Sequence, residues 1–385
     1  MRDVSIIGIG QTKVKEHWNK SLRQLAVEAI LAAMRDAHAD ATRVEAIYVG
    51  NMLSGVLGGQ EQLGALIADA AGLRGVEALK VEAANGADAG ALHLAYLAIA
   101  AGMYDSVAVV GVEKMTEASN CAATAATSLA GDGDYEAMLG ISPAALAALL
   151  MRRYMYEYDL VAEDLAGFSV NAHANAVNNP HAMFPRPITR ESFVAAKMIA
   201  DPINLLDSAP LGDGAAALIL TASDRLNGNR ATSVRIAASA VATDAVTLAE
   251  RRDPLWLSAA EKSVHKAYAQ ARVKPDEIDL FELHDAYTIL STLALEAAGF
   301  AERGRGAYLS RDGEITPQGR VPISTMGGLK ARGHPVGATG VYQAVEVVQQ
   351  LRGQAGKNQV PNARIGMTQS LGGIGATAVT HIFTN

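Results

Sequence analysis

The chain has very little cysteine: Cys121 is the one thiol among its 385 residues. A single thiol excludes an internal disulfide, so we expect a reducing, cytoplasmic environment. Cys121 lies among small and polar residues in Ser119–Thr124, with no histidine close in sequence. A catalytic thiol normally needs a neighbouring base or positive charge to ionise it. We therefore expect Cys121 to be an inert or partly buried thiol rather than a nucleophile.

Long apolar runs, positive charge and aromatic residues are also scarce. The run Ala144–Met151 is far shorter than the ~20 residues of a membrane-spanning helix, and the N-terminus opens on a strand pattern without a signal peptide. The net charge of −7 argues against nucleic acid or an anionic membrane as the main partner. Half of the residues are hydrophobic but only 5% are aromatic. This composition indicates a core of Ala, Val, Leu and Ile, as helices packed on a sheet would give.

Strand patterns alternate with amphipathic helix patterns along the chain. The first half predicts strands and helices in the order Val4–Ile9, Ser21–Asp36 (helix), Val44–Gly50, Leu79–Ala83, Ala87–Ala101 (helix) and Ser106–Gly111. The second half predicts Trp256–Arg272 (helix), Ile278–Leu283, Gly337–Leu351 (helix) and Arg364–Thr368. The alternation is typical of a layered α/β fold. The shared order indicates two copies of one α/β unit.

The stretch 116–200 fits this alternation poorly. It contains Gly131-Asp132-Gly133-Asp134, a helical run rich in Ala, Leu, Met and Tyr, and Asn178-Asn179-Pro180. Insertions of this length are often functional. We therefore predict a first half of residues 1–228, with an inserted helical subdomain or lid at 116–200, and a second half of residues 229–385.

Asn85 stands where an apolar strand pattern ends and a helix pattern begins. A side chain at a helix N-terminus lies near free N–H groups and the positive end of the helix dipole. Asparagine is among the best N-cap residues, so the local sequence favours a simple cap. The alternative is a site residue, because many folds present a nucleophile at this join. A carboxamide, however, has no thiol to ionise and is a very poor nucleophile.

Two histidines end strand or turn patterns. His284 closes the strand Ile278–Leu283, and sites in α/β proteins lie at the carboxyl ends of strands. Its neutral imidazole can donate to an oxyanion or move a proton. The alternative is an incidental histidine in a capping turn, with Asp285 as the cap. His334 precedes a proline and a helix pattern and can act as a base.

His334 belongs to the most specific segment, GGLKARGHPVGATG at 327–340. Its glycines allow a backbone to approach a ligand closely, and the turn leads into a helix N-terminus. Lys330 and Arg332 add positive charge. The glycines can also mark tight turns alone, but their density beside a histidine favours a site. A weaker signal is the run 367–377, where Gln369 and Ser370 precede several glycines.

Together these segments resemble the thiolase superfamily over essentially the full length, and most of all bacterial and archaeal thiolases of the lipid-transfer-protein type. The resemblance rests on Gly8–Thr12, Val112–Thr116, His284–Ala286 and above all 327–340. It implies an α/β fold of two βαβαβαββ halves in five layers, α-β-α-β-α, with an inserted loop domain. It also implies a coenzyme A thioester as substrate, with no covalently bound cofactor and no metal. The family's usual assembly is a homodimer or a dimer of dimers, and relatives often work beside a small zinc-ribbon/OB-fold acyl-CoA-binding protein.

The same resemblance assigns roles to positions of this chain. Asn85 falls where the family carries its nucleophilic cysteine, and Ala87-Asp88 falls on the following Ser-Gly. His334 matches the histidine that activates the nucleophile, and His284 matches the oxyanion-hole position. A second acid/base position falls on Gln369-Ser370. The remaining candidates are Tyr287 and Tyr342 for catalysis, and Gly327, Gly328, Lys330, Gly333 and Gly373 for binding the thioester.

Three functions fit this pattern. The favoured one is a lyase without an acyl-enzyme, which performs retro-aldol cleavage of a 3-hydroxyacyl-CoA or a decarboxylation, as steroid side-chain aldolases related to thiolases suggest by analogy. The second is an inactive acyl-CoA-binding or scaffold homologue, whose channel could be filled by a side chain such as Asp88. The third is an acetyl-CoA acyltransferase with an engineered Cys→Asn change. The accompanying Ala87-Asp88 and Gln369-Ser370 disfavour the third, because one substitution would not produce them.

Overall fold

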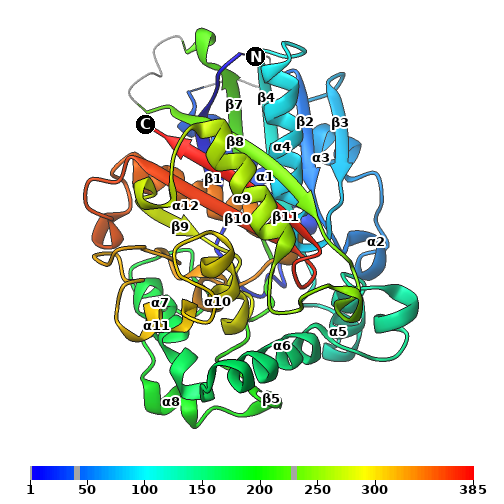
Figure 1. Cartoon of the computed structure of the whole chain (residues 1–385). Coiled ribbons are helices and arrows are strands. Elements are labelled where there is room, and N and C mark those ends of the chain that lie inside the picture. The colour runs from blue at the N-terminus through cyan, green and yellow to red at the C-terminus, as the bar shows by residue number, and fades with distance from the viewer. Residues whose placement is uncertain (1, 39–43, 227–231) are drawn as a thin grey trace.

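The computed structural model describes residues 2–38, 44–226 and 232–385, which form a layered α/β fold (Figure 1). Its main strands are β1 (Val4–Gln11), β2 (Ala46–Gly50), β3 (Glu77–Val81), β4 (Ser106–Glu113), β7 (Gly214–Ala222), β8 (Val234–Thr243), β9 (Leu280–Glu282), β10 (Ile365–Gly372) and β11 (Thr377–Thr384). Within the described residues they join in the order β3-β2-β4-β7-β1-β8-β11-β10-β9. The two halves of the chain meet at β1 and β8, which pair only at Ser5↔Arg235 and Ile6↔Val234.

Outward from this join, the two halves repeat one topology. β1 pairs antiparallel with β7, β7 antiparallel with β4, and β4 parallel with β2. In the second half β8, β11, β10 and β9 pair in the same order with the same directions. The parallel pair β2–β3 corresponds to a single parallel bridge, Phe281↔Ile323. The predicted duplication of an α/β unit is therefore confirmed.

The helices form three layers around the two half-sheets. In the middle lie α4 (Ala87–Ala100) and α12 (Thr339–Leu351), which pack against each other and against strands of both halves. Nearly all of α12 is buried, as expected for a helix with sheets on both sides. On the outside, α1 (Leu22–Asp36) covers β1 and β7, and α9 (Ser258–Ala271) covers β8 and β11. This is the predicted five-layer α-β-α-β-α arrangement.

Between β4 and β7 the chain forms a mainly helical region, where the sequence predicted an insertion. It contains α5 (Asn120–Ser128), α6 (Pro143–Tyr158), α7 (Ala166–Ala176), α8 (Arg190–Val194) and the strand pair β5 (Met198–Ala200) and β6 (Ile203–Asn204). In the second half α10 (Thr288–Ala297) and α11 (Gly306–Arg311) join α6 and α7 in one apolar cluster, below the sheet in Figure 1. The short helices α2 (Ser54–Leu57) and α3 (Leu63–Ala70) lie beside β3. The predicted boundary at 228/229 lies outside the described residues.

The predicted element boundaries differ from the structure where a tight turn intervenes. Leu79–Ala83 was predicted as a strand, but β3 ends at Val81 because Ala84 has a left-handed backbone (φ 49°) and opens a 3₁₀ turn, η2 (Ala84–Gly86). The helix predicted from Gly337 likewise begins with a 3₁₀ turn, η9 (Val336–Ala338). These two turns occupy equivalent places before α4 and α12. They lie against each other in the middle of the molecule.

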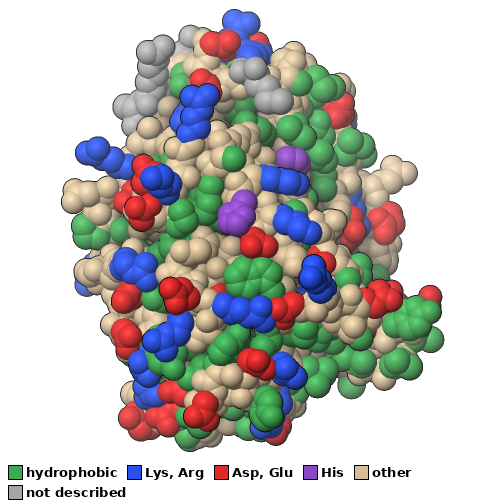
Figure 2. All heavy atoms as spheres, in the orientation of Figure 1, with side chains coloured by type: hydrophobic (Ala, Val, Ile, Leu, Met, Phe, Trp, Pro, Cys, Tyr) green, Lys and Arg blue, Asp and Glu red, His purple; other side chains and the backbone are tan. Residues whose placement is uncertain are grey.

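The surface carries both charge signs intermixed, as Figure 2 shows for one face. Exposed hydrophobic side chains occur around the segment after α5, namely Leu129, Tyr135, Met138 and Leu139. Among the described residues, no helix combines the length and hydropathy needed to cross a bilayer.

Candidate active site

The two facing turns bring Asn85 and His334 together. The Asn85 Nδ2 lies 3.3 Å from Nε2 of His334, although the two residues are 249 positions apart. The backbone N–H of His334 donates to the Pro210 carbonyl at 2.9 Å, which fixes the turn that carries the imidazole. Asn85 and the Gly333-His334 turn therefore meet at a common centre.

The orientation of the Asn85 amide follows from its partners. The backbone N–H of Gly373 donates to the Asn85 Oδ1 at 3.2 Å, so the oxygen faces that N–H and the NH₂ group faces His334. An NH₂ group is a donor only, so Nε2 of His334 must be the acceptor and carries no proton. The proton of the neutral ring then lies on Nδ1, which donates to Thr339 Oγ1 at 2.7 Å. His334 thus presents a free base toward position 85.

Asn85 does not cap the helix that follows it. The N-cap position of α4 is Gly86, which makes no side-chain capping bond, and the Asn85 carboxamide is used by Gly373 and His334 instead. The local prediction of a simple N-cap was therefore wrong. The 3₁₀ turn η2 intervenes and rotates the side chain away from the free N–H groups of α4.

His284 and His334 meet edge to face, with ring centroids 5.2 Å apart. Burial lowers the pKa of His334 well below its ordinary value, and His284 and Arg332 lower it further. Burial also lowers the pKa of His284 to about 3, with Arg332 as the second cause. Both rings are therefore neutral at pH 7, and each offers one donor and one acceptor. The Nδ1 of His284 is buried and bonds no described residue.

Asn85, His284 and His334 line one side of a cavity of about 260 Å³. Further walls come from the helical region between β4 and β7, including α5 and the start of α6, and carry both apolar side chains and Thr and Ser hydroxyls. Tyr287 also lines the cavity, and burial raises its pKa to about 12, so it stays protonated. A cavity of this kind, with a few convergent polar groups in an apolar wall, is typical of a small-molecule site.

Asp88 does not fill this cavity. Its buried carboxylate accepts hydrogen bonds from the backbone N–H groups of Ala89, Gly340 and Val341. Gly340 and Val341 belong to the first turn of α12, so Asp88 in one half caps the helix of the other half. Burial raises the pKa of Asp88 to about 7, against these bonds, which lower it. The channel expected to be blocked in a scaffold protein is therefore not blocked by this side chain.

The glycines of the 327–334 loop have a packing role in the structure. A Cβ on Gly328 would lie 2.3 Å from Asp285 Oδ2, and one on Gly333 would lie 2.6 Å from a Val14 methyl group. Both glycines also have positive φ angles, 51° and 106°. Gly327, Gly328 and Gly333 do not line the cavity. The predicted contact of these three with a thioester is not visible in the geometry.

Lys330 is also part of the support rather than of the cavity wall. It is 2% exposed, and its Nζ donates to the backbone carbonyl of Asp207. Burial lowers its pKa to about 8, whereas Asp285 and Asp207 raise it. Asp285 was a candidate helix cap, but its carboxylate accepts from the Leu329 N–H at 2.7 Å and the Ser324 hydroxyl at 3.1 Å. Both residues therefore fix the loop that carries His334.

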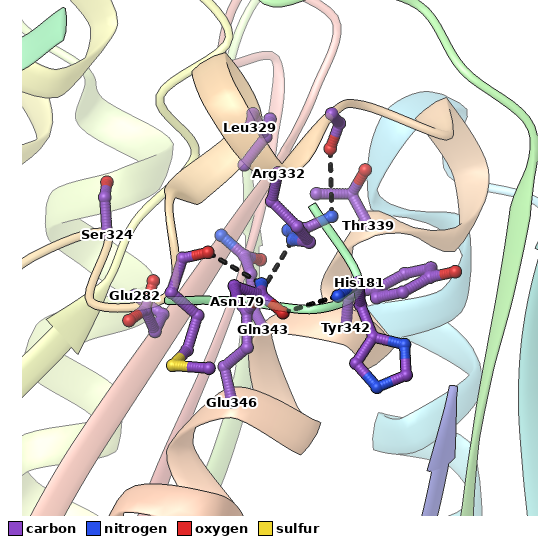
Figure 3. A network of polar contacts seen from close by, with 12 residues as sticks. Asn179, His181, Glu282, Ser324, Leu329, Arg332, Thr339, Tyr342, Gln343 and Glu346 are labelled. Carbon is purple, nitrogen blue, oxygen red and sulfur yellow. Dashed lines mark hydrogen bonds and ion pairs between the residues drawn. The ribbon is translucent and has the colours of Figure 1, made fainter. Parts of the chain in front are cut away.

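Arg332 lies in a buried polar network (Figure 3). It is fully buried, forms an ion pair with Glu346 at 2.8 Å, and lies over the Tyr342 ring at 4.8 Å. The Tyr342 hydroxyl donates to the Thr12 carbonyl and does not reach the cavity. Tyr342 therefore belongs to the network around Arg332.

The polar pair Gln369 and Ser370 lies away from the cavity. Strand alternation within β10 points the two side chains to opposite faces of the half-sheet. Gln369 donates to the Ala260 carbonyl on α9, and Ser370 donates to Gln343 on α12. The residue of this run that reaches the site is Gly373, which lines the cavity and holds Asn85.

Sequence reasoning missed several residues that the structure places at the site. Thr339 orients His334, and its signal was its place in the GHPVGATG segment itself. Arg251 lines the cavity from a loop and Glu136 from the π-helical turn Gly133–Ala137, and neither belongs to a recognisable motif. Cys121 is exposed and does not line the cavity, as expected for an inert thiol. The described residues contain no group of three or more His, Cys, Asp or Glu side chains arranged to hold a metal ion.

The fold and the site define a duplicated α/β protein with a polar centre between its halves. Residues 4–224 match the family "Thiolase, N-terminal domain" and residues 240–385 match "Thiolase C-terminal domain-like". The chain is 45% identical to an acetyl-CoA acetyltransferase of Methanothermobacter thermautotrophicus over 384 residues, which cover 100% of both chains. It is 32% identical to the benzoylsuccinyl-CoA thiolase subunit of Thauera aromatica over 378 residues, 97% of this chain and 95% of the relative.

This chain therefore belongs to the thiolase family. Among solved structures, its fold is similar to that of a chain of the Ltp2-ChsH2(DUF35) aldolase, with a TM-score of 0.85 and 24% identity. The match covers 98% of this chain and 97% of that chain. The predicted family and fold class are confirmed.

Proposed function

We propose that this protein cleaves a carbon–carbon bond beside a coenzyme A thioester without forming an acyl-enzyme. The observation that carries the proposal is the position of Asn85, whose NH₂ group faces the unprotonated Nε2 of His334 in a cavity without a thiol. A hydrogen-bond donor at this place can stabilise an oxyanion, whereas it cannot take an acyl group. The favoured reaction is retro-aldol cleavage of a 3-hydroxyacyl-CoA.

The proposed step begins when the 3-hydroxyl group of the substrate replaces the Asn85 NH₂ group as the donor to Nε2 of His334. Nε2 of His334 takes the proton of the 3-hydroxyl group, the bond between C2 and C3 breaks, and its electron pair moves into the thioester to form an enolate. The released fragment leaves as an aldehyde or ketone. The Asn85 NH₂ group, displaced from Nε2 by the substrate hydroxyl, and an N–H of His284 donate to the enolate oxygen. The imidazolium of His334 then returns its proton to C2, which gives a shortened acyl-CoA.

Decarboxylation of a malonyl-type thioester is the second candidate, since it requires the same enolate stabilisation. An acyl-CoA-binding protein without catalysis is the third, and the open cavity with two neutral histidines argues against it. The 45% identity to a protein named acetyl-CoA acetyltransferase keeps thiolase chemistry as a fourth candidate. A panel of 3-oxoacyl-, 3-hydroxyacyl- and malonyl-CoA esters separates these candidates, with free CoA, carbonyl product and CO₂ as the readouts.

We also propose two partners for this protein. The first is a second copy of the chain, since a homodimer is the smallest assembly expected for a thiolase. The second is a small zinc-ribbon/OB-fold protein, because the structurally similar aldolase is named together with a ChsH2(DUF35) component. The substrate panel is therefore best measured both with the chain alone and with such a protein added.

The protein is expected to remain unmodified by acetyl-CoA. Asn85 cannot form a thioester, and Cys121 is exposed outside the cavity, so neither provides an activated thiol. Intact-mass spectrometry after incubation is the measurement, with Asn85→Cys as the positive control because it puts a thiol beside His334. A stable acetyl adduct on the unaltered protein, at Cys121 for instance, would refute the non-covalent reaction.

Cleavage is expected to stay constant between about pH 6 and pH 8. The base must be neutral, and burial lowers the pKa of His334 well below 6.5, so the neutral form persists as the pH falls through 6.5. Activity is then lost only at lower pH, as His334 protonates. A pH profile of kcat/KM with an acid limb at 6.5 or above contradicts His334 as the base.

A further inference from the structure

Arg251 is a buried cation in the wall of the cavity, and no step of the proposed reaction uses it. It follows the 3₁₀ turn η6 (Leu248–Glu250), in the loop between β8 and α9, and is 6% exposed. Its Nε donates to the Ala245 carbonyl at 3.3 Å and its Nη1 to the Ile374 carbonyl at 2.7 Å. The Nη2 group bonds no residue that the structure describes, so a donor pair of this guanidinium stays unused at the cavity wall.

The charge of Arg251 has no direct counter-ion among the described residues. Burial lowers the pKa of its guanidinium, and Asp244 and Glu136 raise it, but neither carboxylate forms an ion pair with it. Glu136 also lines the cavity, and its two oxygens accept from the backbone N–H groups of Leu248 and Asp132, at 2.8 and 3.2 Å. A buried charge is normally paired, so an unpaired guanidinium at a ligand cavity indicates an anionic ligand group.

Arg251 lies within reach of an acyl chain held at the centre of the site. Ile374, whose carbonyl accepts from Arg251, directly follows Gly373, whose N–H holds Asn85. Two consecutive residues span at most about 7 Å, so the guanidinium lies within about 13 Å of the Asn85 amide. The cavity lining also includes the apolar side chains of Ile141, Leu146, Leu248 and Ile374, together with Thr and Ser hydroxyls. A short aliphatic chain that ends in a charged group fits such a surface.

We propose that Arg251 forms a subsite for a carboxylate at the far end of the acyl chain, so that the preferred substrates are dicarboxylic acyl-CoA esters. The subsite rests on the proposed function only in placing the thioester at Asn85 and His334. A carboxylate there accepts charge-assisted hydrogen bonds from Nη2, in a cavity with little water to compete. Glu136 opposes this binding by repulsion, although the N–H groups of Leu248 and Asp132 hold its oxygens.

The test compares esters that differ only in the terminal group. Succinyl-CoA, glutaryl-CoA and adipyl-CoA carry a carboxylate where butyryl-CoA, pentanoyl-CoA and hexanoyl-CoA carry a methyl group. Isothermal titration calorimetry gives their dissociation constants for the unaltered full-length protein and for Arg251→Gln and Arg251→Lys. We expect at least one dicarboxylic ester to bind more tightly than its partner, and Arg251→Gln to weaken that ester about 10- to 100-fold. Arg251→Lys keeps the charge and is expected to have an intermediate effect.

A matched variant on the same wall is expected to change the affinity for dicarboxylic esters in the opposite direction. Glu136→Gln removes the anion and is expected to tighten binding of the dicarboxylic esters several-fold, with little change for the monocarboxylic ones. If Arg251 serves only to hold the Ile374 loop, or binds the CoA moiety itself, Arg251→Gln weakens both members of each pair equally. That result, or equal affinity of the paired esters for the unaltered protein, overturns the proposal.

These measurements separate the subsite from the reaction. Binding is read without turnover, so a carboxylate preference that depends on Arg251 supports the subsite even if no ester is cleaved. Cleavage of 3-hydroxyacyl esters without any carboxylate preference supports the reaction and overturns the subsite. Should Arg251→Gln fail to fold, Arg251→Lys and Glu136→Gln still decide the question, because each predicts a change confined to the dicarboxylic esters.

Discussion

Replacing His334 by alanine is expected to lower carbon–carbon cleavage about 10²- to 10⁴-fold, which is the usual contribution of a positioned general base. The structure gives the physical reason. The Asn85 NH₂ group and the Thr339 hydroxyl together leave Nε2 of His334 unprotonated and directed at the cavity. Binding of the CoA ester is expected to change little, because the imidazole is one group in a cavity with many apolar contacts. Single-turnover cleavage and calorimetric binding measure the two effects separately.

A matched control is available in His93→Ala. His93 is partly buried, hydrogen-bonds Ser239 at 2.8 Å and does not line the cavity, so its loss is expected to leave cleavage nearly unchanged. Thr339→Val complements it, since it removes the group that orients His334 but keeps the ring. Unchanged cleavage in His334→Ala would refute the assignment of the base. An equal loss in His93→Ala would point to general destabilisation instead.

Replacing Arg332 by methionine is expected to lower the free energy of unfolding by about 3–5 kcal/mol, the cost of breaking a buried ion pair. Arg332 and Glu346 are both almost fully buried and lie 2.8 Å apart (Figure 3). Burial already raises the pKa of Glu346 to about 6, even with the guanidinium beside it. Without Arg332 this carboxyl group stays buried and unpaired. Urea unfolding monitored by circular dichroism measures the change.

The double variant Arg332→Met with Glu346→Leu tests whether the loss of stability comes from the unpaired carboxyl group of Glu346. It removes both charges, so most of the lost stability is expected to return. Arg153→Met is the surface control, because Arg153 pairs with Glu157 in an exposed helical arrangement that contributes only about 0.3–0.5 kcal/mol. A loss of less than about 1 kcal/mol in Arg332→Met would show that the buried pair contributes little to the stability of the fold.

Much of the fold could be predicted from the sequence because hydrophobic periodicity follows burial directly. The helix predicted at Ser21–Asp36 is an example, since Leu25, Ala29 and Ile30 recur at helical spacing and are all buried on one face of α1. The order of elements revealed the duplication, which pairing directions then confirmed. Positions of tight turns could not be predicted, because the left-handed backbone at Ala84 depends on contacts made across the two halves.

The site was only partly predictable. The sequence indicated Asn85, His284 and His334, and the structure brings these three to one cavity. It also suggested Gln369 and Ser370, which face away because the strand continues to Gly372 and alternates its side chains. A family motif marks a strand end approximately, whereas one residue of register decides which side chain faces the ligand. The sequence did not single out Arg251, because an arginine in the charged run Glu250-Arg251-Arg252-Asp253 resembles any surface cation.

Because of Asp88, the two halves of the duplicated fold use their central helices differently. Duplication supplies two equivalent helix ends at the centre, each with free N–H groups that could serve a ligand. The Asp88 carboxylate occupies those of α12 at Gly340 and Val341, so that end is reserved for joining the two halves. At the end of α4, the N-cap residue Gly86 makes no side-chain bond, and the same Asp88 carboxylate accepts from the Ala89 N–H alone. The two equivalent helix ends are therefore used differently. The end of α12 serves to join the two halves, so the duplicated fold has a centre that is not chemically symmetric.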